Sequence, residues 1–228
     1  MGLLSSDADT TYYDNLYSYT KRDSLVALAY YVALWLACYG TGHYLAASNY
    51  TINLGIPVSV VLALIPVVIC RHSLSKVGIS RNNLKPSLLA ACAIGSVYLF
   101  LAAILPGIRE HRQLLPIPRI AYNVFYYFIL IGFIEEIQFR GFIQPRLFPL
   151  FKREWLTTLM GGILFAFMHI PFQMFARQMS FGELLSEHNI IGTMLYSFFF
   201  TYLYRRYGNI FCPAVLHGFI DLAHGIFR

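Results

Sequence analysis

The sequence predicts an all-helical membrane protein, a polytopic transmembrane bundle with about seven membrane spans. Apolar residues make up 57% of the 228 residues, only 12% are charged, and the mean hydropathy is +0.57. Soluble domains average about 45–50% apolar and about 25% charged residues. Charge this sparse cannot cover a water-exposed surface, so the composition excludes an ordinary soluble enzyme and a disordered chain. In addition, several stretches are apolar over about the 20 residues that a membrane helix needs.

Seven such stretches each predict one membrane-spanning helix. They are residues 24–47, 51–70, 87–108, 118–138, 155–176, 189–204 and 207–227. Residues 1–23 are polar and form a predicted cytoplasmic segment, and residues 24–228 form a single predicted transmembrane domain. The run that follows the fourth stretch, residues 141–154, mixes Phe, Leu and basic residues, which indicates a kinked or interfacial helix at the cytoplasmic face.

The distribution of basic residues predicts the orientation. With the N-terminus inside, 11 Lys and Arg residues fall in inner segments and 5 in outer segments, leaving Arg140 aside. Cytoplasmic loops of membrane proteins carry an excess of Lys and Arg, so we expect a cytoplasmic N-terminus in the cell (inner) membrane. We therefore attribute the net charge of +6 to the basic cytoplasmic loops and not to nucleic-acid binding. The lipid bilayer is the expected partner, and no nucleic acid is expected.

Three charged residues, Glu135, Glu136 and Arg140, lie at or just after the end of the fourth stretch. Glu136 and Arg140 are four residues apart, so they share a helix face and can pair, whereas Glu135 points about 100° away. An exposed ion pair at a helix end would explain Glu136 and Arg140, but it leaves Glu135 without a structural reason. Ionisable groups inside a membrane are candidates for function because a charge at the bilayer centre costs about 2.5–3.5 kcal/mol.

Two further stretches carry ionisable groups. His169 follows Phe165 by four residues, in a helix that contains Gly161 and Gly162, and these glycines permit close approach of a neighbouring helix. His217 and Asp221 lie four residues apart on one face of the last stretch. Each group alone fits a polar seam between helices, but one shared cavity explains all three groups together.

Together these residues predict hydrolysis of an amide bond by an activated water. Glu135, desolvated among apolar side chains, would act as the general base, and a neutral His169 would hold the water. Glu136 paired with Arg140 would fix the polarity of the site. His217 and Asp221 would face the developing oxyanion; if ionised, Asp221 would instead orient His217. No cofactor is expected, although two histidines and a carboxylate also permit a zinc alternative.

The three groups resemble the motifs of the CPBP intramembrane proteases, which include CAAX prenyl endopeptidases and Abi-type bacteriocin-processing enzymes. The resemblance rests on EEIQFRGFIQPRLFPL, FAFMHIP and GNIFCPAVLHGFID, in this order, across a core of about residues 125–224. It implies an all-helical fold, a site open toward the cytosol and a membrane-associated peptide or protein as substrate. It also implies that Glu135 activates the water, supported by Glu136 and Arg140. By the same resemblance His169 positions the water, and His217 with Asp221 forms the oxyanion-side pair.

The sequence departs from the family pattern at a few positions. Asp221 stands where prenyl endopeptidases carry Asn, and bulky residues 198–200 stand where relatives often have glycine, so that they either narrow a substrate groove or face lipid. His224 lies outside the pattern. Two other classes remain as alternatives: a noncatalytic membrane partner or immunity protein of the same fold, and a transporter with a Glu–His proton relay.

Overall fold

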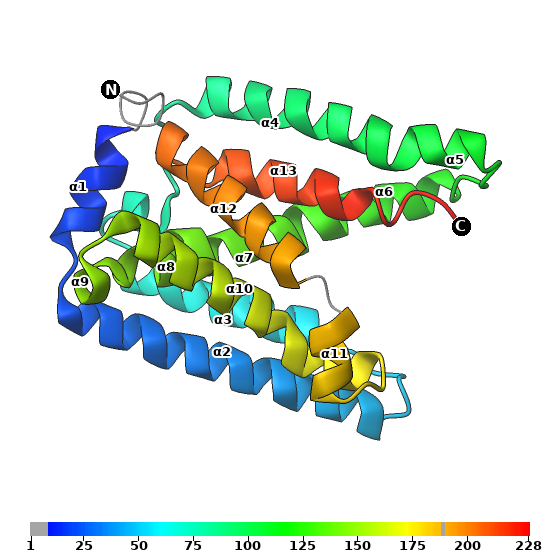
Figure 1. Ribbon diagram of the computed structural model, residues 1–228, viewed down its shortest axis with the longest axis horizontal. Helices are drawn as coiled ribbons and strands as arrows, with labels where there is room; N and C mark the ends of the chain where they lie inside the picture. The colour runs from blue at the N-terminus through cyan, green and yellow to red at the C-terminus, as the bar shows by residue number, and fades with distance from the viewer. Residues whose placement is uncertain (1–8, 188–189) are drawn as a thin grey trace.

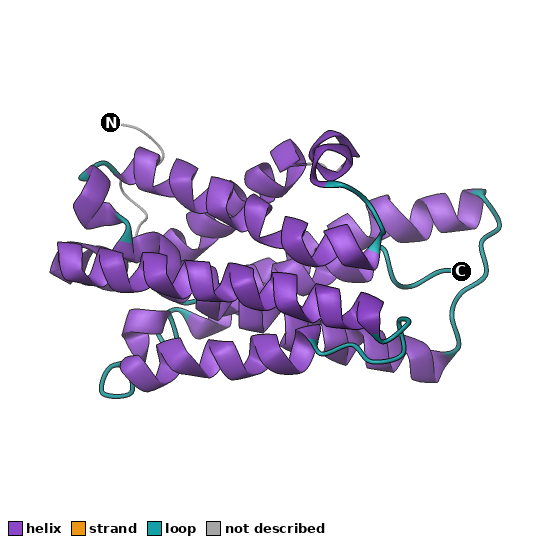
Figure 2. Ribbon diagram, turned by 90° about the horizontal axis from the view of Figure 1, so that it is seen from below, coloured by secondary structure: helices purple, strands orange, loops and turns teal. Residues whose placement is uncertain are grey.

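Helices are the only extended regular structure in residues 9–187 and 190–228, the part of the chain that the computed structural model describes (Figures 1 and 2). An isolated bridge joins Leu114 to Phe227. The α-helices are α1 (Thr10–Ser18), α2 (Lys21–Ala47), α3 (Gly55–Ile69), α4 (Leu84–Leu99), α5 (Leu105–Arg109), α6 (Ile117–Phe125), α7 (Ile134–Glu136), α8 (Gln144–Arg146), α9 (Phe148–Phe151), α10 (Glu154–Ala176), α11 (Phe181–Glu187), α12 (Ile190–Tyr207) and α13 (Phe211–Leu222). One 3₁₀-helix, η1 (Leu74–Val77), and three π-helical segments, η2 (Phe100–Ile104), η3 (Tyr126–Phe133) and η4 (Ile137–Ile143), connect or interrupt them.

Within the described residues, four continuous helical segments are long and apolar enough to cross a membrane. They are Lys21–Ala47, Leu84–Arg109, Ile117–Phe151 and Glu154–Ala176. The apolar helices α3 and α13 have 15 and 12 residues, which is shorter than a usual spanning helix. Each of the seven predicted stretches contains a helix, although residue 189, where the sixth begins, lies outside the described residues. Seven helical stretches are therefore present and four qualify as spans, so the other three spans remain a prediction.

The bundle has two distinct ends, which Figure 1 shows at its left and right. The first, which we call the α1 end, gathers α1, η1, α9 and the 207–210 turn: Asp9 donates its backbone N–H to Arg205, and Ile210 donates to Gly78. The second, which we call the C-terminal end, gathers the 48–54 turn, the 110–116 loop and residues 223–228. There, Leu115 donates to the carbonyl of Ile226.

The α1 end is closed by packed side chains. Tyr12 and Leu16 of α1 form a buried cluster with Ile137, Tyr204 and Ile210. Residues 10–18 of the predicted polar segment 1–23 thus form a helix that covers one end of the bundle, and α2 begins at Lys21 within that segment. Residues 1–8 of the predicted segment lie outside the described residues.

The helical segment Ile117–Phe151 is largely exposed in its first part and buried further on, with α13 packed against η3 and α10 packed against α2 and α12. Its residues 136–147 are all buried. The kinked or interfacial helix predicted for residues 141–154 is interrupted at Leu147, between α8 and α9, and neighbouring helices enclose residues 141–147. Its position at the cytoplasmic face stays a prediction. The close approach predicted at Gly161 and Gly162 is confirmed: a Cβ there would come within 2.5 Å of Gln144 and 2.6 Å of Phe198, respectively.

Candidate active site

The two adjacent glutamates lie on α7, a single short turn between the π-helical segments η3 and η4. A π-helical segment inserts extra residues per turn and rotates the side chains that follow it, and such segments are frequent at functional sites. The helix is continuous through the site. The π-helical segments η3 and η4, on either side of α7, determine the direction in which each side chain points. The three residues of α7 are α-helical, and Glu135 lines the cavity whereas Glu136 is fully enclosed, as expected for neighbours that point in different directions.

Glu136 and Arg140 form an ion pair that is fully enclosed. Arg140 Nη1 donates to Glu136 Oε1 at 3.0 Å, and both side chains have 0% exposure. The exposed ion pair that a helix end would give is excluded by this burial. The Arg140 guanidinium lies over the rings of Phe165 and Phe200, with its Cζ 4.4 and 5.1 Å from their centroids. Desolvated contacts of this kind stabilise a cation by about 2 kcal/mol.

Glu136 also holds His217. The Nδ1 atom of His217 lies 3.2 Å from Glu136 Oε1, the oxygen that accepts from Arg140. A carboxylate accepts only, so Nδ1 carries the hydrogen and the ring turns its Nε2 edge toward the opposite side. The ring is further fixed by Phe200, which stacks on it with centroids 5.0 Å apart. The buried pair therefore orients an imidazole on another helix.

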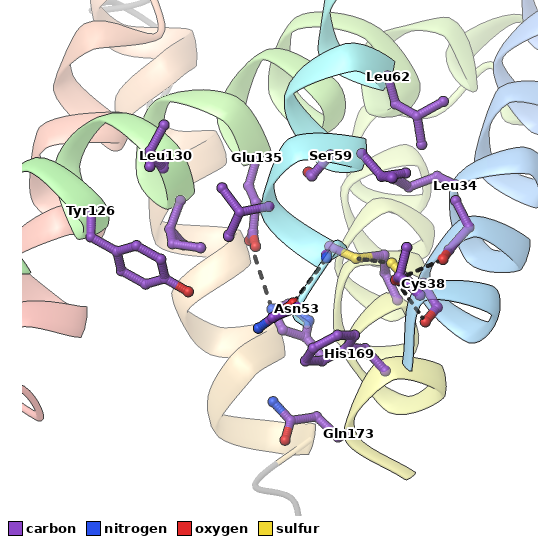
Figure 3. A pocket seen from close by; sticks show the side chains of 18 of the residues that line it. Leu34, Cys38, Asn53, Ser59, Leu62, Tyr126, Leu130, Glu135, His169 and Gln173 are labelled. Atoms are coloured by element: carbon purple, nitrogen blue, oxygen red, sulfur yellow. Dashed lines mark hydrogen bonds and ion pairs between the residues drawn. The ribbon is translucent and has the colours of Figure 1, made fainter. Parts of the chain in front are cut away.

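Glu135 faces the two histidines across the interior of the bundle, and Figure 3 shows its side chain directed toward His169. Its Oε2 lies 3.7 Å from His169 Nε2 and 3.9 Å from His217 Nε2. Neither distance is a hydrogen bond, and this oxygen is buried without a hydrogen-bond partner among the described residues. The predicted meeting of a carboxylate and two imidazoles from three different helices is thus present in the structure.

The tautomer of His169 follows from its backbone contact. Its Nδ1 lies 2.8 Å from the carbonyl oxygen of Phe165, one turn earlier in α10. Because a carbonyl accepts only, Nδ1 carries the hydrogen, and the Nε2 of the neutral ring presents a lone pair. Glu135 Oε2 and His169 Nε2 are then two acceptors that face each other at 3.7 Å.

Asp221 lies beside the same group. Its Oδ2 is 3.6 Å from His217 Nε2, one helical turn away on α13. Three carboxylates, from Glu135, Glu136 and Asp221, thus lie within 4 Å of one imidazole. The six residues singled out in the sequence form one continuous group, in which Arg140 reaches the cavity only through Glu136.

A cavity of about 400 Å³ adjoins this group and is bounded by α2, α3, η3, α10 and α13. Its lining includes Glu135, His169, His217 and Asp221, and also His224, which lies outside the motifs identified in the sequence. Apolar residues make up much of the remaining wall, among them Leu34, Leu62, Leu130, Ile131 and Met168. A cavity of this size, apolar with a few convergent polar groups, is typical of a small-molecule or peptide site.

The cavity opens toward the C-terminal end. Asn53 and His224 are the two lining residues that are exposed, and both lie at that end. Helix α1 lies at the other end of the bundle (Figure 1). The cytoplasmic N-terminus and the site open toward the cytosol, both expected from the sequence, stay predictions.

Phe200 is the site residue that sequence reasoning missed. Of the two expectations for residues 198–200, lipid contact fits Phe199, which is 37% exposed, whereas Phe200 is 1% exposed and packs on the Arg140 and His217 side chains. Phe198 lies against Gly162 of α10. The signal in the sequence was an aromatic residue in a helix that follows two charged motifs, which is too common among membrane helices to select one position.

A histidine that binds a metal usually donates its other ring N–H to an oxygen acceptor. His169 and His217 both have such a contact, because each Nδ1 lies beside an oxygen acceptor. Even so, in the described part of the chain no group of three or more His, Cys, Asp or Glu side chains is arranged so that it could hold a metal ion. The distances of 3.7 and 3.9 Å between the Glu135 oxygen and the two ring nitrogens exceed the roughly 3.3 Å between ligands on a tetrahedral zinc, calculated from bonds of about 2.0 Å. The expectation that the site needs no cofactor stays a prediction, and chelation distinguishes it from the zinc alternative.

Comparison with known proteins identifies the segment that carries this site. A family model described as Rce1-like, type II CAAX prenyl endopeptidase Rce1-like, matches residues 117–223. This range begins with α6 and ends directly after α13, so it includes all six candidate residues. Neither the curated proteins nor the solved structures give a match.

Proposed function

Because this chain is a member of the CPBP/CAAX protease family over residues 117–223, we propose that it is an intramembrane endopeptidase. It hydrolyses a peptide bond of a membrane-associated protein or peptide, using a water activated by a glutamate. The catalytic core is residues 125–224 within one transmembrane domain, 24–228. The protein resides in the cell (inner) membrane with its N-terminus in the cytoplasm.

One observation carries the proposal: two acceptors, Glu135 Oε2 and His169 Nε2, face each other at 3.7 Å. A water molecule has two O–H donors, so a single water can donate to both atoms and is held with its lone pairs directed into the cavity. Glu135 takes one proton as the water oxygen bonds to the substrate carbonyl carbon. The proton is then delivered to the leaving nitrogen as the C–N bond breaks, which yields a carboxylic acid and an amine.

His217 and Asp221 act on the developing oxyanion. With Nδ1 committed to Glu136, His217 directs Nε2 toward the space beside Glu135 and Asp221. A doubly protonated His217 donates Nε2–H to the oxyanion, and Asp221 orients that ring in its ionised form. Donors preorganised toward developing charge typically give the largest single contribution to such reactions.

Glu136 and Arg140 are positioning residues. Their side chains have 0% exposure, so they do not contact substrate. The guanidinium, held between two aromatic rings, fixes the Glu136 carboxylate, and this carboxylate fixes His217. The reaction needs no cofactor in this proposal; a zinc-dependent form of the same hydrolase is the alternative that a chelator distinguishes.

The decisive experiment compares the membrane-associated peptides of cells that express the wild type with those of cells that express Glu135→Gln. This substitution keeps the side-chain volume and removes the base. We expect peptides that appear only with the wild type and an uncleaved precursor that accumulates with the variant. In a reconstituted assay with that precursor, loss of a general base should lower the rate about 10²–10⁴-fold, and His169→Ala should also be inactive.

Glu183→Gln is the matched control, because Glu183 is an exposed glutamate of α11. It should leave the peptide pattern and the cleavage rate unchanged. Identical peptides in wild-type and Glu135→Gln cells, with both proteins present in the membrane at equal amounts, would support the noncatalytic alternative and refute the proposed hydrolase.

A further inference from the structure

The π-helical segment η3 contributes a row of side chains to the cavity wall beside Glu135. The lining residues from this part of the chain are Tyr126, Tyr127, Leu130, Ile131 and Glu135. Steps of four and five residues lead from Tyr126 to Glu135. These side chains therefore form one continuous part of the wall, which we call the η3 strip and which ends at the proposed base.

The π-helical geometry of η3 explains why Tyr126 lies on the same face as Glu135. The two residues are nine positions apart, and in an ideal α-helix nine steps of about 100° would place them on opposite faces. A π-helix, in which hydrogen bonds join residues five apart, has about 4.4 residues per turn. Nine positions then make about two full turns, so Tyr126 and Glu135 both line the cavity.

The hydroxyl of Tyr126 is directed into the cavity. Figure 3 shows its ring reaching from η3, with the hydroxyl on the side where Glu135 and His169 lie. The half-buried ring stacks on Tyr122, with centroids 5.9 Å apart, and meets Tyr127 edge-on at 5.2 Å, so two neighbours fix its direction. A tyrosine hydroxyl inside a protein usually finds a hydrogen-bond partner. Among the described residues this one has none, so it is available to a molecule in the cavity.

Tyr126 supplies the hydrogen-bonding group of the η3 strip ahead of the proposed base. Leu130 and Ile131, which follow it along the strip, have no side-chain donor or acceptor. Tyr127 packs against Gly225 instead, since a Cβ added there would be 2.9 Å from the Tyr127 hydroxyl oxygen. A peptide that lies along the strip therefore meets one hydroxyl, then an apolar stretch, then the proposed base.

The spacing of Tyr126 and Glu135 sets the length of peptide that can contact both. At about 1.5 Å per residue, nine positions correspond to about 13 Å along the helix axis. A segment cleaved here has to be free of helical backbone pairing, which would occupy its carbonyl groups. Because extended peptide advances about 3.3 Å per residue, the Tyr126 hydroxyl is within about four residues of a scissile bond placed beside Glu135.

From these observations we propose that Tyr126 is a substrate-binding residue, whose hydroxyl donates a hydrogen bond to a backbone carbonyl of an extended substrate. The contact lies within about four residues of the scissile bond. Resting on the proposed endopeptidase function, it adds a length requirement to the substrate: on one side of the cleaved bond the extended segment has to reach Tyr126.

The test removes the hydroxyl and keeps the ring, in the variant Tyr126→Phe. Tyr122→Phe is the matched control, because it makes the same change on a ring that is 50% exposed and does not line the cavity. The probes are synthetic peptides with the sequence of the precursor that accumulates with Glu135→Gln. They are shortened by one residue at a time on either side of the cleaved bond.

We expect Tyr126→Phe to raise KM for the full-length peptide about 3–10-fold, as for loss of one hydrogen bond, and to leave kcat unchanged. A contact made equally with substrate and transition state changes KM alone. The effect should vanish for peptides too short on one side to reach the hydroxyl. An unchanged KM, a fall in kcat, the same effect at every peptide length, or an equal effect of Tyr122→Phe would overturn the proposal.

Binding separates this contact from the proposed function. The dissociation constant of the full-length peptide is measured for Glu135→Gln with and without Tyr126→Phe, and we expect the same 3–10-fold weakening. Tyr126-dependent binding by a wild type that cleaves nothing would refute the protease and leave the contact intact. Glu135-dependent cleavage, with equal binding by the two variants, would refute the contact and leave the protease intact.

Discussion

The ring of Phe200 stacks on the ring of His217, with centroids 5.0 Å apart and an interplanar angle of 28°. Phe200 comes from α12 and His217 from α13, so this contact joins two helices at the site. Since the same phenyl ring lies under the Arg140 guanidinium, one apolar side chain supports both the buried cation and the imidazole that faces Glu135.

We therefore expect Phe200→Ala to lower both stability and activity. Removing a buried phenyl ring costs about 3–5 kcal/mol, and here it also frees the ring of His217. Thermal unfolding of the purified protein in detergent should show a lower midpoint, and cleavage of the precursor should fall at least tenfold. Phe199→Ala is the control, because the neighbouring ring is 37% exposed and stacks on Tyr202; an equal effect of both changes would contradict the assigned role.

The Arg140–Glu136 pair gives a prediction in which stability and activity separate. Arg140→Met breaks a buried ion pair and leaves the Glu136 carboxylate with His217 in place of the guanidinium, which should cost about 3–5 kcal/mol. The double variant Glu136→Leu with Arg140→Met removes both charges and should recover most of that stability. It should stay inactive, because His217 Nδ1 loses its acceptor.

Unfolding in detergent and precursor cleavage, measured on the two single variants and the double variant, test this separation. An active double variant would show that the pair does not position His217. A double variant no more stable than Arg140→Met would show that the two charges do not depend on each other.

The sequence predicted which residues form the candidate site better than it predicted how the neighbouring helices enclose that site. Helical spacing was enough to pair Glu136 with Arg140 and to turn Glu135 away, because those relations are set within one turn of helix. The meeting of Glu135 with His169 and His217 was predicted from charged residues that have no reason to face lipid. Both inferences needed only local geometry and the cost of burying charge.

The rest depends on tertiary packing. Residues 141–147 have an amphipathic composition that fits an interface, but neighbouring helices enclose them. The end at which the cavity opens follows from how α1 and η1 cover the bundle, and no spacing along the chain encodes that. The role of Phe200 likewise depends on which face of α12 meets α13.

Chelation separates the water mechanism from its zinc alternative. If a glutamate alone activates the water, cleavage of the precursor by the purified protein should be unchanged after treatment with EDTA or 1,10-phenanthroline and dialysis. Two ring nitrogens and a carboxylate on a zinc ion would instead give loss of activity and recovery on addition of zinc. Recovery by zinc, checked with stoichiometric metal analysis of the active protein, would replace the proposed mechanism by the metal-dependent one.

Close packing of α13 on η3 gives the last prediction. A Cβ on Gly218 would lie 2.6 Å from the ring of Phe128 and 2.9 Å from its Cα, and the backbone cannot yield as a flexible side chain would. Gly218→Ala should therefore push α13 away from η3 and move the adjacent His217 away from Glu135. Shifts of about 1 Å at a catalytic group cost about 10²-fold in rate, so precursor cleavage should fall by about that factor. Gly40→Ala on α2 is the control, since no atom lies within 4 Å of its added Cβ. This change should leave cleavage unaltered and raise stability by up to about 1 kcal/mol through helix propensity, and wild-type cleavage by Gly218→Ala would show that the site tolerates displacement of α13.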